Sequence, residues 1–133
     1  LTVDLGYPGT NIPAMAGADC FNTTQTYPQK ERWTMLDESG EYEDFYNRYC
    51  HIGATLGSET SFELLNTDYV NVTLSPEKFK ELKIKYVVSR NSIDEKIVSG
   101  TVFGENQSSL PNGGIEFKKC YSGAELSIYE CIY

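Results

Sequence analysis

The sequence predicts an α+β fold, in which one domain over residues 1–133 contains a mixed β-sheet, short helices on one side of it and a C-terminal antiparallel hairpin region. Three observations carry this prediction. Apolar and polar residues alternate in several short runs, which is the period of half-buried strands. A proline-led helix start follows Ser75, between two such runs. Two further apolar runs flank Ser122-Gly123 near the end of the chain, as in a hairpin.

The composition is that of a globular domain. At 133 residues, with 40% hydrophobic and 23% charged residues, the chain can bury about two-thirds of its unfolded surface. Its net charge of −8 argues against nucleic-acid binding, which needs a basic surface, and against docking on anionic lipid. No apolar run reaches the length of a membrane span, and no signal peptide opens the sequence. Because Leu1–Leu5 resembles a strand entered in mid-protein, we expect the chain to be part of a longer protein.

The first half of the chain predicts its elements through capping residues and apolar stripes. Asn11 is expected to cap a short apolar helix that Gly17 ends. Trp33 and Leu36 lie on one stripe of a second helix. In order, the expected elements are a strand at residues 1–5, a helix at 12–16, an extended hydroxyl-rich loop at 20–28, a helix at 29–36 and a helix at 42–49.

The stretch from Tyr42 to His51 is the densest in side chains that stack, donate hydrogen bonds or titrate. Its aromatic residues repeat at helical spacing, which predicts a helix with an aromatic stripe facing the core. The stripe consists of Tyr42, Phe45, Tyr46 and Tyr49. Asn47, Arg48 and His51 lie off this stripe or at its end, and an arginine near a helix C-terminus is favoured by the helix dipole without any ligand.

The second half contains the clearest helix start. Ser75 is a capping residue and Pro76 suits the first helical position, so a short helix should bury Phe79 and Leu82 against the sheet. A strand on either side makes this unit βαβ-like. In order, the expected elements are strands at 52–56, 62–65 and 69–74, the helix after Ser75 with Lys78, Lys80 and Lys83 on its outer face, a strand at 85–89, a run at 96–103, a polar loop at 104–114, and strands at 115–121 and 125–133.

Two stretches match catalytic patterns weakly. Ser75 and Lys78 fit the S-x-x-K spacing of acyl-serine enzymes, but helix capping already explains the serine. His51 with Asp44 or Glu43 could act as a general base, yet no nucleophile lies on a recognisable elbow.

The acidic residues and the cysteines do not match metal-site spacings. Asp37, Glu38, Glu41, Glu43 and Asp44 lack the alternation of a calcium loop and predict a solvated acidic face. The cysteines have no CxxC spacing, so no metal or cofactor is expected. Cys120 and Cys131 lie on the two hairpin strands, where a disulfide is feasible; the alternative is buried free thiols.

A polar-ligand cleft has a firmer physical basis. Aromatic rings for stacking and planar hydrogen-bonding groups are the usual lining of a sugar site, although core packing explains the rings equally well. The candidate ligand-binding residues are Tyr27, Trp33, Asn47, Arg48 and His51, with Tyr46 as a further ring.

Several stretches together resemble a known class of proteins. They are Asn11-Ile-Pro-Ala-Met-Ala-Gly17, Phe21-Asn-Thr-Thr24, Tyr27-Pro28, Trp33, Tyr46-Asn-Arg-Tyr-Cys-His-Ile52, Phe62-Glu-Leu64, Asp68, Val72-Thr-Leu74 and Leu82-Lys-Ile-Lys-Tyr-Val-Val-Ser89. Their order and spacing over residues 11–89 resemble the extracytoplasmic C-terminal domain of large multi-spanning bacterial membrane proteins of the GT-C-like, glycosyltransferase-like class. Cys50 departs from that pattern, which has a small residue before the histidine.

The resemblance implies a non-catalytic domain on the extracytoplasmic face of the bacterial cell membrane, attached to the transmembrane region of the same protein. It implies a link to cell-envelope glycan assembly and contact with glycan or lipid-linked sugar, without nucleic acid or cofactor. It also implies that Asn47, Arg48 and His51 turn inward and hydrogen-bond the loop from Asn22 to Tyr27. A secreted carbohydrate-binding module and a small hydrolase remain the alternatives.

Overall fold

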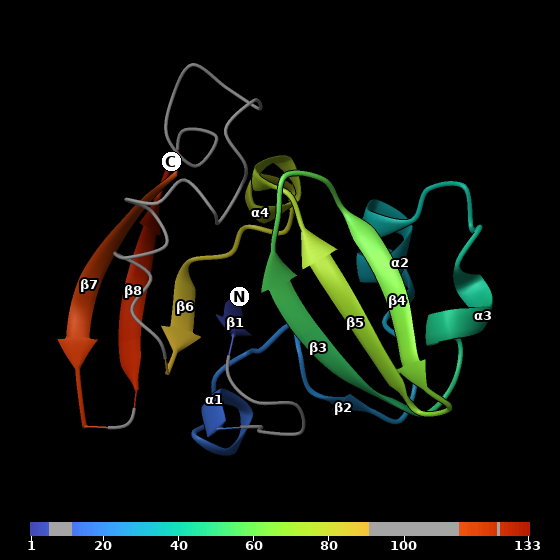
Figure 1. Cartoon of the computed structure of the whole chain (residues 1–133), viewed down its shortest axis with the longest axis horizontal. Helices are drawn as coiled ribbons and strands as arrows, with labels where there is room; N and C mark the ends of the chain where they lie inside the picture. The colour runs from blue at the N-terminus through green and yellow to red at the C-terminus, as the bar shows by residue number, and fades with distance from the viewer. Residues whose placement is uncertain (6–11, 91–114, 125) are drawn as a thin grey trace.

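The helices and strands of the chain confirm the α+β class. The structure is a computed structural model that describes residues 1–5, 12–90, 115–124 and 126–133 (Figure 1). In chain order the elements are β1 Thr2–Asp4, α1 Ile12–Met15, β2 Thr24–Gln25, α2 Lys30–Leu36, α3 Glu43–Tyr46, β3 Cys50–Leu56, β4 Ser61–Asn66, β5 Tyr69–Leu74, α4 Pro76–Glu81, β6 Tyr86–Ser89, β7 Glu116–Ser122 and β8 Ser127–Ile132. The expected Asn11 cap, the run at 96–103 and the loop at 104–114 lie outside the described residues.

The described strands form two four-stranded sheets, where one mixed sheet and a separate hairpin were expected. One sheet has the order β2-β3-β5-β4 and the other the order β1-β6-β8-β7. In each sheet one pair is parallel, β3 with β5 and β1 with β6, and the other pairs are antiparallel. The sheets lie side by side, and the beginning and end of the chain share one of them (Figure 1).

Among the described residues, one cluster of buried side chains joins the two sheets. Val70, Val72 and Leu74 come from β5, while Val87 of β6 and Tyr129 of β8 come from the other sheet, and all are fully buried. The alternation of β5 arises because Asn71 and Thr73 point away from this cluster. The core therefore runs between the sheets rather than beneath one of them.

The consecutive elements β5, α4 and β6 do not form the expected βαβ unit within one sheet. β6 pairs with β1 on one side and with β8 on the other, so neither of its edges is open to β5. The hydrogen bonds around Lys85 show this, because its N–H donates to the Leu1 carbonyl and its carbonyl accepts from the Cys131 N–H, both at 2.8 Å.

Helix α4 begins at the residues that the sequence indicated. The Ser75 side chain accepts a hydrogen bond from the Lys78 N–H at 3.3 Å, and Pro76 occupies the first turn. Phe79 and Leu82 are buried, and the Phe79 ring meets Phe117 of β7 edge-on with 6.3 Å between ring centroids. The prediction that this helix buries Phe79 and Leu82 is confirmed.

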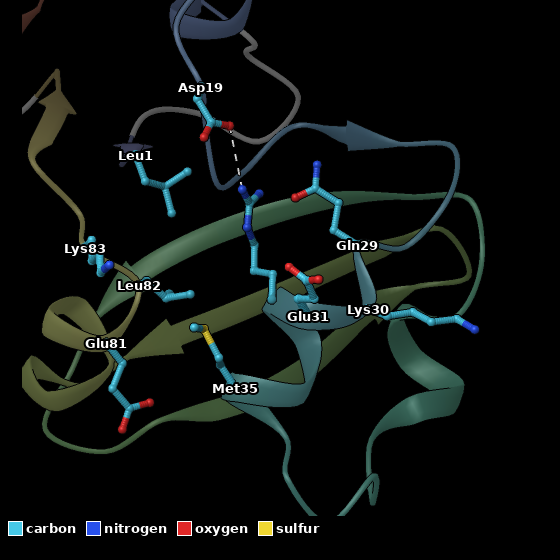
Figure 2. A pocket seen from close by; sticks show the side chains of 10 residues that line it. Leu1, Asp19, Gln29, Lys30, Glu31, Met35, Glu81, Leu82 and Lys83 are labelled. Atoms are coloured by element: carbon cyan, nitrogen blue, oxygen red, sulfur yellow. Dashed lines mark ion pairs between the residues drawn. The ribbon is translucent and has the colours of Figure 1, made fainter.

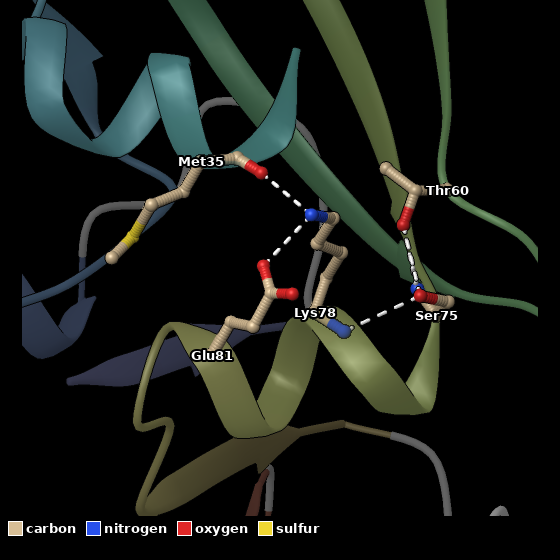
Figure 3. Close-up of polar contacts among 5 residues, drawn as sticks. All are labelled: Met35, Thr60, Ser75, Lys78 and Glu81. Atoms are coloured by element: carbon tan, nitrogen blue, oxygen red, sulfur yellow. Dashed lines mark hydrogen bonds and ion pairs between the residues drawn. The ribbon is translucent and has the colours of Figure 1, made fainter. Parts of the chain in front are cut away.

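One of the three lysines expected on the outer face of α4 points inward instead. The Lys78 ammonium donates to the Met35 carbonyl and to the Glu81 carboxylate, each at 2.7 Å (Figure 3). Met35 lies in the last turn of α2, where carbonyls lack a helical partner. Lys78 therefore joins the end of α2 to α4, while Lys80 and Lys83 are exposed as expected.

The aromatic helix is shorter than its sequence pattern predicts. Helix α3 covers Glu43–Tyr46 only, Tyr46 is buried, Tyr42 and Phe45 are half-buried, and Tyr49 is 53% exposed. The backbone leaves the helical conformation at Asn47, with φ −80° and ψ 53°, and the Gln25 side chain donates to the Tyr46 and Arg48 carbonyls on either side of that residue. The chain then enters β3 at Cys50.

The expected Cys120–Cys131 disulfide is absent, and both residues are free thiols. The register of β7 with β8 places Cys131 opposite Phe117, and it shifts between Lys119 and Tyr121. Cys131 is buried, whereas Cys120 is exposed with its thiol 3.3 Å from the Ile128 carbonyl oxygen. Cys131 therefore matches the alternative of a buried free thiol.

Thiol labelling should report this arrangement. In the folded chain a disulfide reagent is expected to modify Cys120 first, because burial raises the pKa of Cys20, of Cys50 and of Cys131 and keeps them as thiols. Unfolding should release all four cysteines to the reagent, as read by intact mass. If fewer than four thiols of a freshly purified chain react after unfolding, two cysteines are joined in a disulfide, which would contradict the four free thiols described above.

Asn22 joins the first strand to the loop that follows α1. Its side-chain oxygen accepts from the Asp4 N–H at 2.7 Å, and its side-chain amide donates to the Asp4 carbonyl. Asn22 is 7% exposed, so this paired hydrogen bond extends β1 in the way a neighbouring strand would.

Candidate functional site

The structure does not bring the five predicted ligand-binding residues together. Tyr27 is 83% exposed, while Trp33 is buried and stacks on Tyr46 with the ring centroids 4.3 Å apart. Asn47 is exposed. His51 is half-buried, with its Nδ1 atom 2.9 Å from the Thr24 hydroxyl. The Trp33 ring is thus a core residue, and Tyr27 is the ring that solvent reaches.

Arg48 does not turn inward onto the loop from Asn22 to Tyr27. It is exposed, and its guanidinium donates to the Thr67 carbonyl at 3.3 Å and to the Asp44 carbonyl. His51 does contact that loop, through Thr24. The inward-turning cluster expected for Asn47, Arg48 and His51 is therefore wrong for the first two residues.

We accordingly expect Arg48→Ala to change the free energy of unfolding by no more than about 0.5 kcal/mol, the range of ordinary surface substitutions. Its two hydrogen bonds to carbonyls are made in water, where their net contribution is small. A denaturant titration against the wild type measures the change. A loss of several kcal/mol would instead show that this arginine holds the fold.

The resemblance implied that Arg48 joins the segment before β3 to the loop from Asn22 to Tyr27, and it is the Gln25 side chain that makes this connection. Gln25 is 8% exposed, and its amide donates to the Tyr46 carbonyl and, at 3.1 Å, to the Arg48 carbonyl. Its carbonyl oxygen accepts from the Trp33 indole at 2.9 Å. One side chain therefore joins β2, α2 and the segment before β3. The only sequence signal for it is a polar residue inside an extended run.

The sequence predicted that the whole acidic segment after α2 is solvated, and this prediction is wrong for Asp37. Asp37 is 7% exposed, and its carboxylate accepts from the Tyr46 hydroxyl and from the Tyr42 N–H, each at 3.0 Å. The other acidic residues of the segment are exposed: Glu38, Glu41, Glu43 and Asp44. The buried carboxylate orders the turn into α3, since a buried charge needs such donors.

Because of the Asp37–Tyr46 pair, the free energy of unfolding should depend on pH in the alkaline range. Burial and the Asp37 carboxylate, which accepts the tyrosine proton, raise the pKa of Tyr46 to about 12. An unfolded tyrosine has a pKa of about 10, so above that pH the folded state holds its proton longer. Stability should therefore be complete below about pH 10 and fall as pH rises toward about 12. Denaturant titrations across this window should show a smaller fall for Tyr46→Phe, and equal falls would contradict the assignment.

The polar atoms of the residues with catalytic spacing make hydrogen bonds that hold the fold together. The Ser75 hydroxyl caps α4 and accepts from the Thr60 hydroxyl at 3.0 Å, while Lys78 is bonded to Met35 and Glu81 (Figure 3). The His51 Nδ1 atom faces a threonine rather than Asp44 or Glu43. The S-x-x-K spacing here is explained by helix capping and by the joining of two helices.

Three of the hollows that described residues line lie around α2. The largest, of about 650 Å³, opens between α2, the end of α4 and Leu1, and carries both charges on its rim (Figure 2). A second, of about 380 Å³, lies over the acidic turn and is lined by both Trp33 and Asn47. The third, of about 180 Å³, lies between the hydroxyl-rich loop and α2 and is lined by both Tyr27 and Trp33. Arg48 and His51 line none of these three hollows.

Two negative findings apply to the described ranges 1–5, 12–90, 115–124 and 126–133. Within them no three histidine, cysteine, aspartate or glutamate side chains gather as a metal ion would require. Every helix there also falls short of the length and apolarity needed to cross a bilayer.

Residues 2–133 match a protein family described as a domain of unknown function, DUF7654. The chain belongs to this family. The match includes both sheets, so the two sheets belong to one DUF7654 domain. No curated protein and no solved structure matches the chain. Within the DUF7654 domain, the hollows around α2 are therefore the candidate sites that geometry alone supports.

Proposed function

We propose that the chain is a non-catalytic extracytoplasmic domain of a bacterial multi-spanning membrane protein that takes part in cell-envelope glycan assembly. In this proposal the domain is attached to the transmembrane region of the same protein and contacts glycan or lipid-linked sugar.

One observation carries the non-catalytic part of the proposal: the side chains with catalytic spacing are used as structural links. Ser75 and Lys78 tie α4 to Thr60 and to the end of α2, and His51 contacts β2 through Thr24. A general base needs a proton donor to act on and a partner that orients it. A hydroxyl contact with Thr24 serves strand pairing equally well and supplies no nucleophile.

The location and the partner rest on the sequence resemblance described above. The residues that carry it lie in the part of the chain that forms α1 to β6 and thus the whole β2-β3-β5-β4 sheet. The exposed Tyr27 ring and the hollow that it lines support contact with sugars, since such sites combine an aromatic face with a few polar groups. The same feature favours the alternative of a secreted carbohydrate-binding module.

Two measurements test the proposal. The purified chain and its His51→Ala variant are incubated with panels of chromogenic glycosides and esters, and neither should exceed background. A turnover that His51→Ala abolishes would establish the small-hydrolase alternative instead. Sequencing the complete gene separates the other two readings, because the proposed domain requires flanking membrane spans. A secreted module requires a signal peptide without them.

A further inference from the structure

We infer that the hollow of about 180 Å³ between the Phe21–Gln29 loop and α2 binds an anionic sugar, with Arg32 as the residue that holds its charge. The inference deepens the proposed function and rests on it, because it names the class of sugar that the domain would contact.

Arg32 carries the inference because much of its hydrogen-bonding capacity is unused. Its side chain is only 18% exposed, and its guanidinium lies over the Phe21 ring, 6.0 Å from the ring centroid. Among the described residues its one ion pair is with Asp19, at 3.6 Å, which is longer than a hydrogen bond. Asp19 is itself 75% exposed. A guanidinium has five N–H donors and is always charged, so Arg32 is placed to bind an anion.

The charge of the residues that line the small hollow favours an anionic ligand. Arg32 is the only charged residue among those described that line this hollow, in a chain whose net charge is −8. The two larger hollows are lined by both lysines and acidic residues. A guanidinium pairs with carboxylate or phosphate through two parallel hydrogen bonds, so either group would be held in a defined orientation.

The rest of the lining fits a sugar ring. Thr23 and Thr26 bring hydroxyls, Gln29 brings an amide, and the exposed Tyr27 brings an aromatic face. The volume of about 180 Å³ lies below the range of about 300 to 1,000 Å³ for sites of drug-sized ligands. That is room for one ring with one charged substituent.

The small hollow adjoins the large one. Gln29 and Arg32 line both, and Figure 2 shows Gln29 and Asp19 at the large hollow, with the ion pair drawn from Asp19. A sugar held by Arg32 could therefore continue as a chain of further residues toward α4. The charged group itself should replace Asp19 as the partner of the guanidinium.

The test is calorimetric titration of the full chain with three sugars. Glucuronic acid carries a carboxylate, glucose 1-phosphate carries a phosphate and glucose carries no charge. We expect at least one anionic sugar to bind at least tenfold more tightly than glucose. The tighter of the two anionic sugars identifies the source of the charge.

Four variants locate the binding. Arg32→Gln should weaken it at least tenfold, while Arg48→Gln, which removes the same charge from an exposed site elsewhere, should leave it unchanged. Tyr27→Ala should weaken it without lowering the melting temperature, because this ring is exposed. Asp19→Asn should strengthen it, because a competing carboxylate is removed.

Several outcomes would overturn the inference. They are equal affinity for glucose and both anionic sugars, no binding of any of the three, or equal losses in Arg32→Gln and Arg48→Gln. If Arg32→Gln does not fold, then Tyr27→Ala and Asp19→Asn decide, and unchanged affinity in both contradicts the site. These results are separate from the proposed function, which fails if turnover depends on His51 or if the gene encodes no membrane spans.

Discussion

Replacing Gln25 with methionine should lower the free energy of unfolding by about 3 to 5 kcal/mol, the range for a buried hydrogen-bonded network that loses one member. Methionine keeps the length of the side chain and removes its amide. The Trp33 indole N–H and the Tyr46 and Arg48 carbonyls would then lose their partner. Each buried group left unsatisfied costs about 1 to 3 kcal/mol. Equilibrium denaturation in urea measures the loss.

Gln29→Met is the matched control for this substitution. Gln29 is exposed and precedes α2 without a side-chain cap hydrogen bond, so the same change there should stay within about 0.5 kcal/mol of the wild type. The Trp33 fluorescence of the folded state should also change in Gln25→Met and not in Gln29→Met. Equal stability of the two variants would remove Gln25 from its central role.

Replacing Phe79 with alanine should cost about 3 to 5 kcal/mol, the range for truncating a buried aromatic side chain. The ring is fully buried where α4 meets β7, and the helix backbone around it accepts from the Tyr133 hydroxyl at 3.1 Å. The cavity would open where the two sheets share one core. Thermal and urea denaturation should both report the loss.

Two further variants separate cavity formation from an effect on the helix itself. Phe79→Leu keeps most of the volume and should cost less than about 1.5 kcal/mol. Phe45→Ala removes a phenylalanine from α3, where the ring is half-buried, and should cost less than Phe79→Ala. If Phe79→Leu costs as much as Phe79→Ala, packing is not the cause.

Sequence signals that act within one helical turn predicted an element correctly where no side chain distant in sequence changes the backbone. Ser75 and Pro76 start α4 as expected, because capping and proline geometry act within one turn. The aromatic repeat at Tyr42–Tyr49 predicted too long a helix, because the backbone leaves the helical conformation at Asn47, where Gln25, distant in sequence, binds the carbonyls on either side. The division into two sheets was not predictable for the same reason. A strand's period shows which face is buried and not which strand lies beside it.

The candidate site was predicted in part. Tyr27 was named as a candidate from its residue type, whereas the hydroxyl-rich loop was predicted only as an extended segment, and both line the small hollow. Trp33 also lines it, but as a buried ring. Between Arg32 and Arg48, the sequence favoured Arg48, because it lies in the aromatic stretch. No sequence pattern indicated Arg32, because its position over Phe21 depends on a loop contact that no spacing encodes.

The parallel pairing of β1 with β6 has a consequence for the order in which the chain can fold. Val3 pairs with Val87, and Asp4 with Val88, so β1 has no strand partner in its sheet until β6 has been synthesised. Asn22 can hold Asp4 much earlier, through its side chain. Contacts this distant in sequence form slowly, and an unpaired apolar strand is exposed to aggregation meanwhile. Residues 19–22, which contact β1 through backbone hydrogen bonds at Thr2 and through the Asn22 side chain, would thus hold β1 in an extended conformation until residues 86–88 complete the sheet.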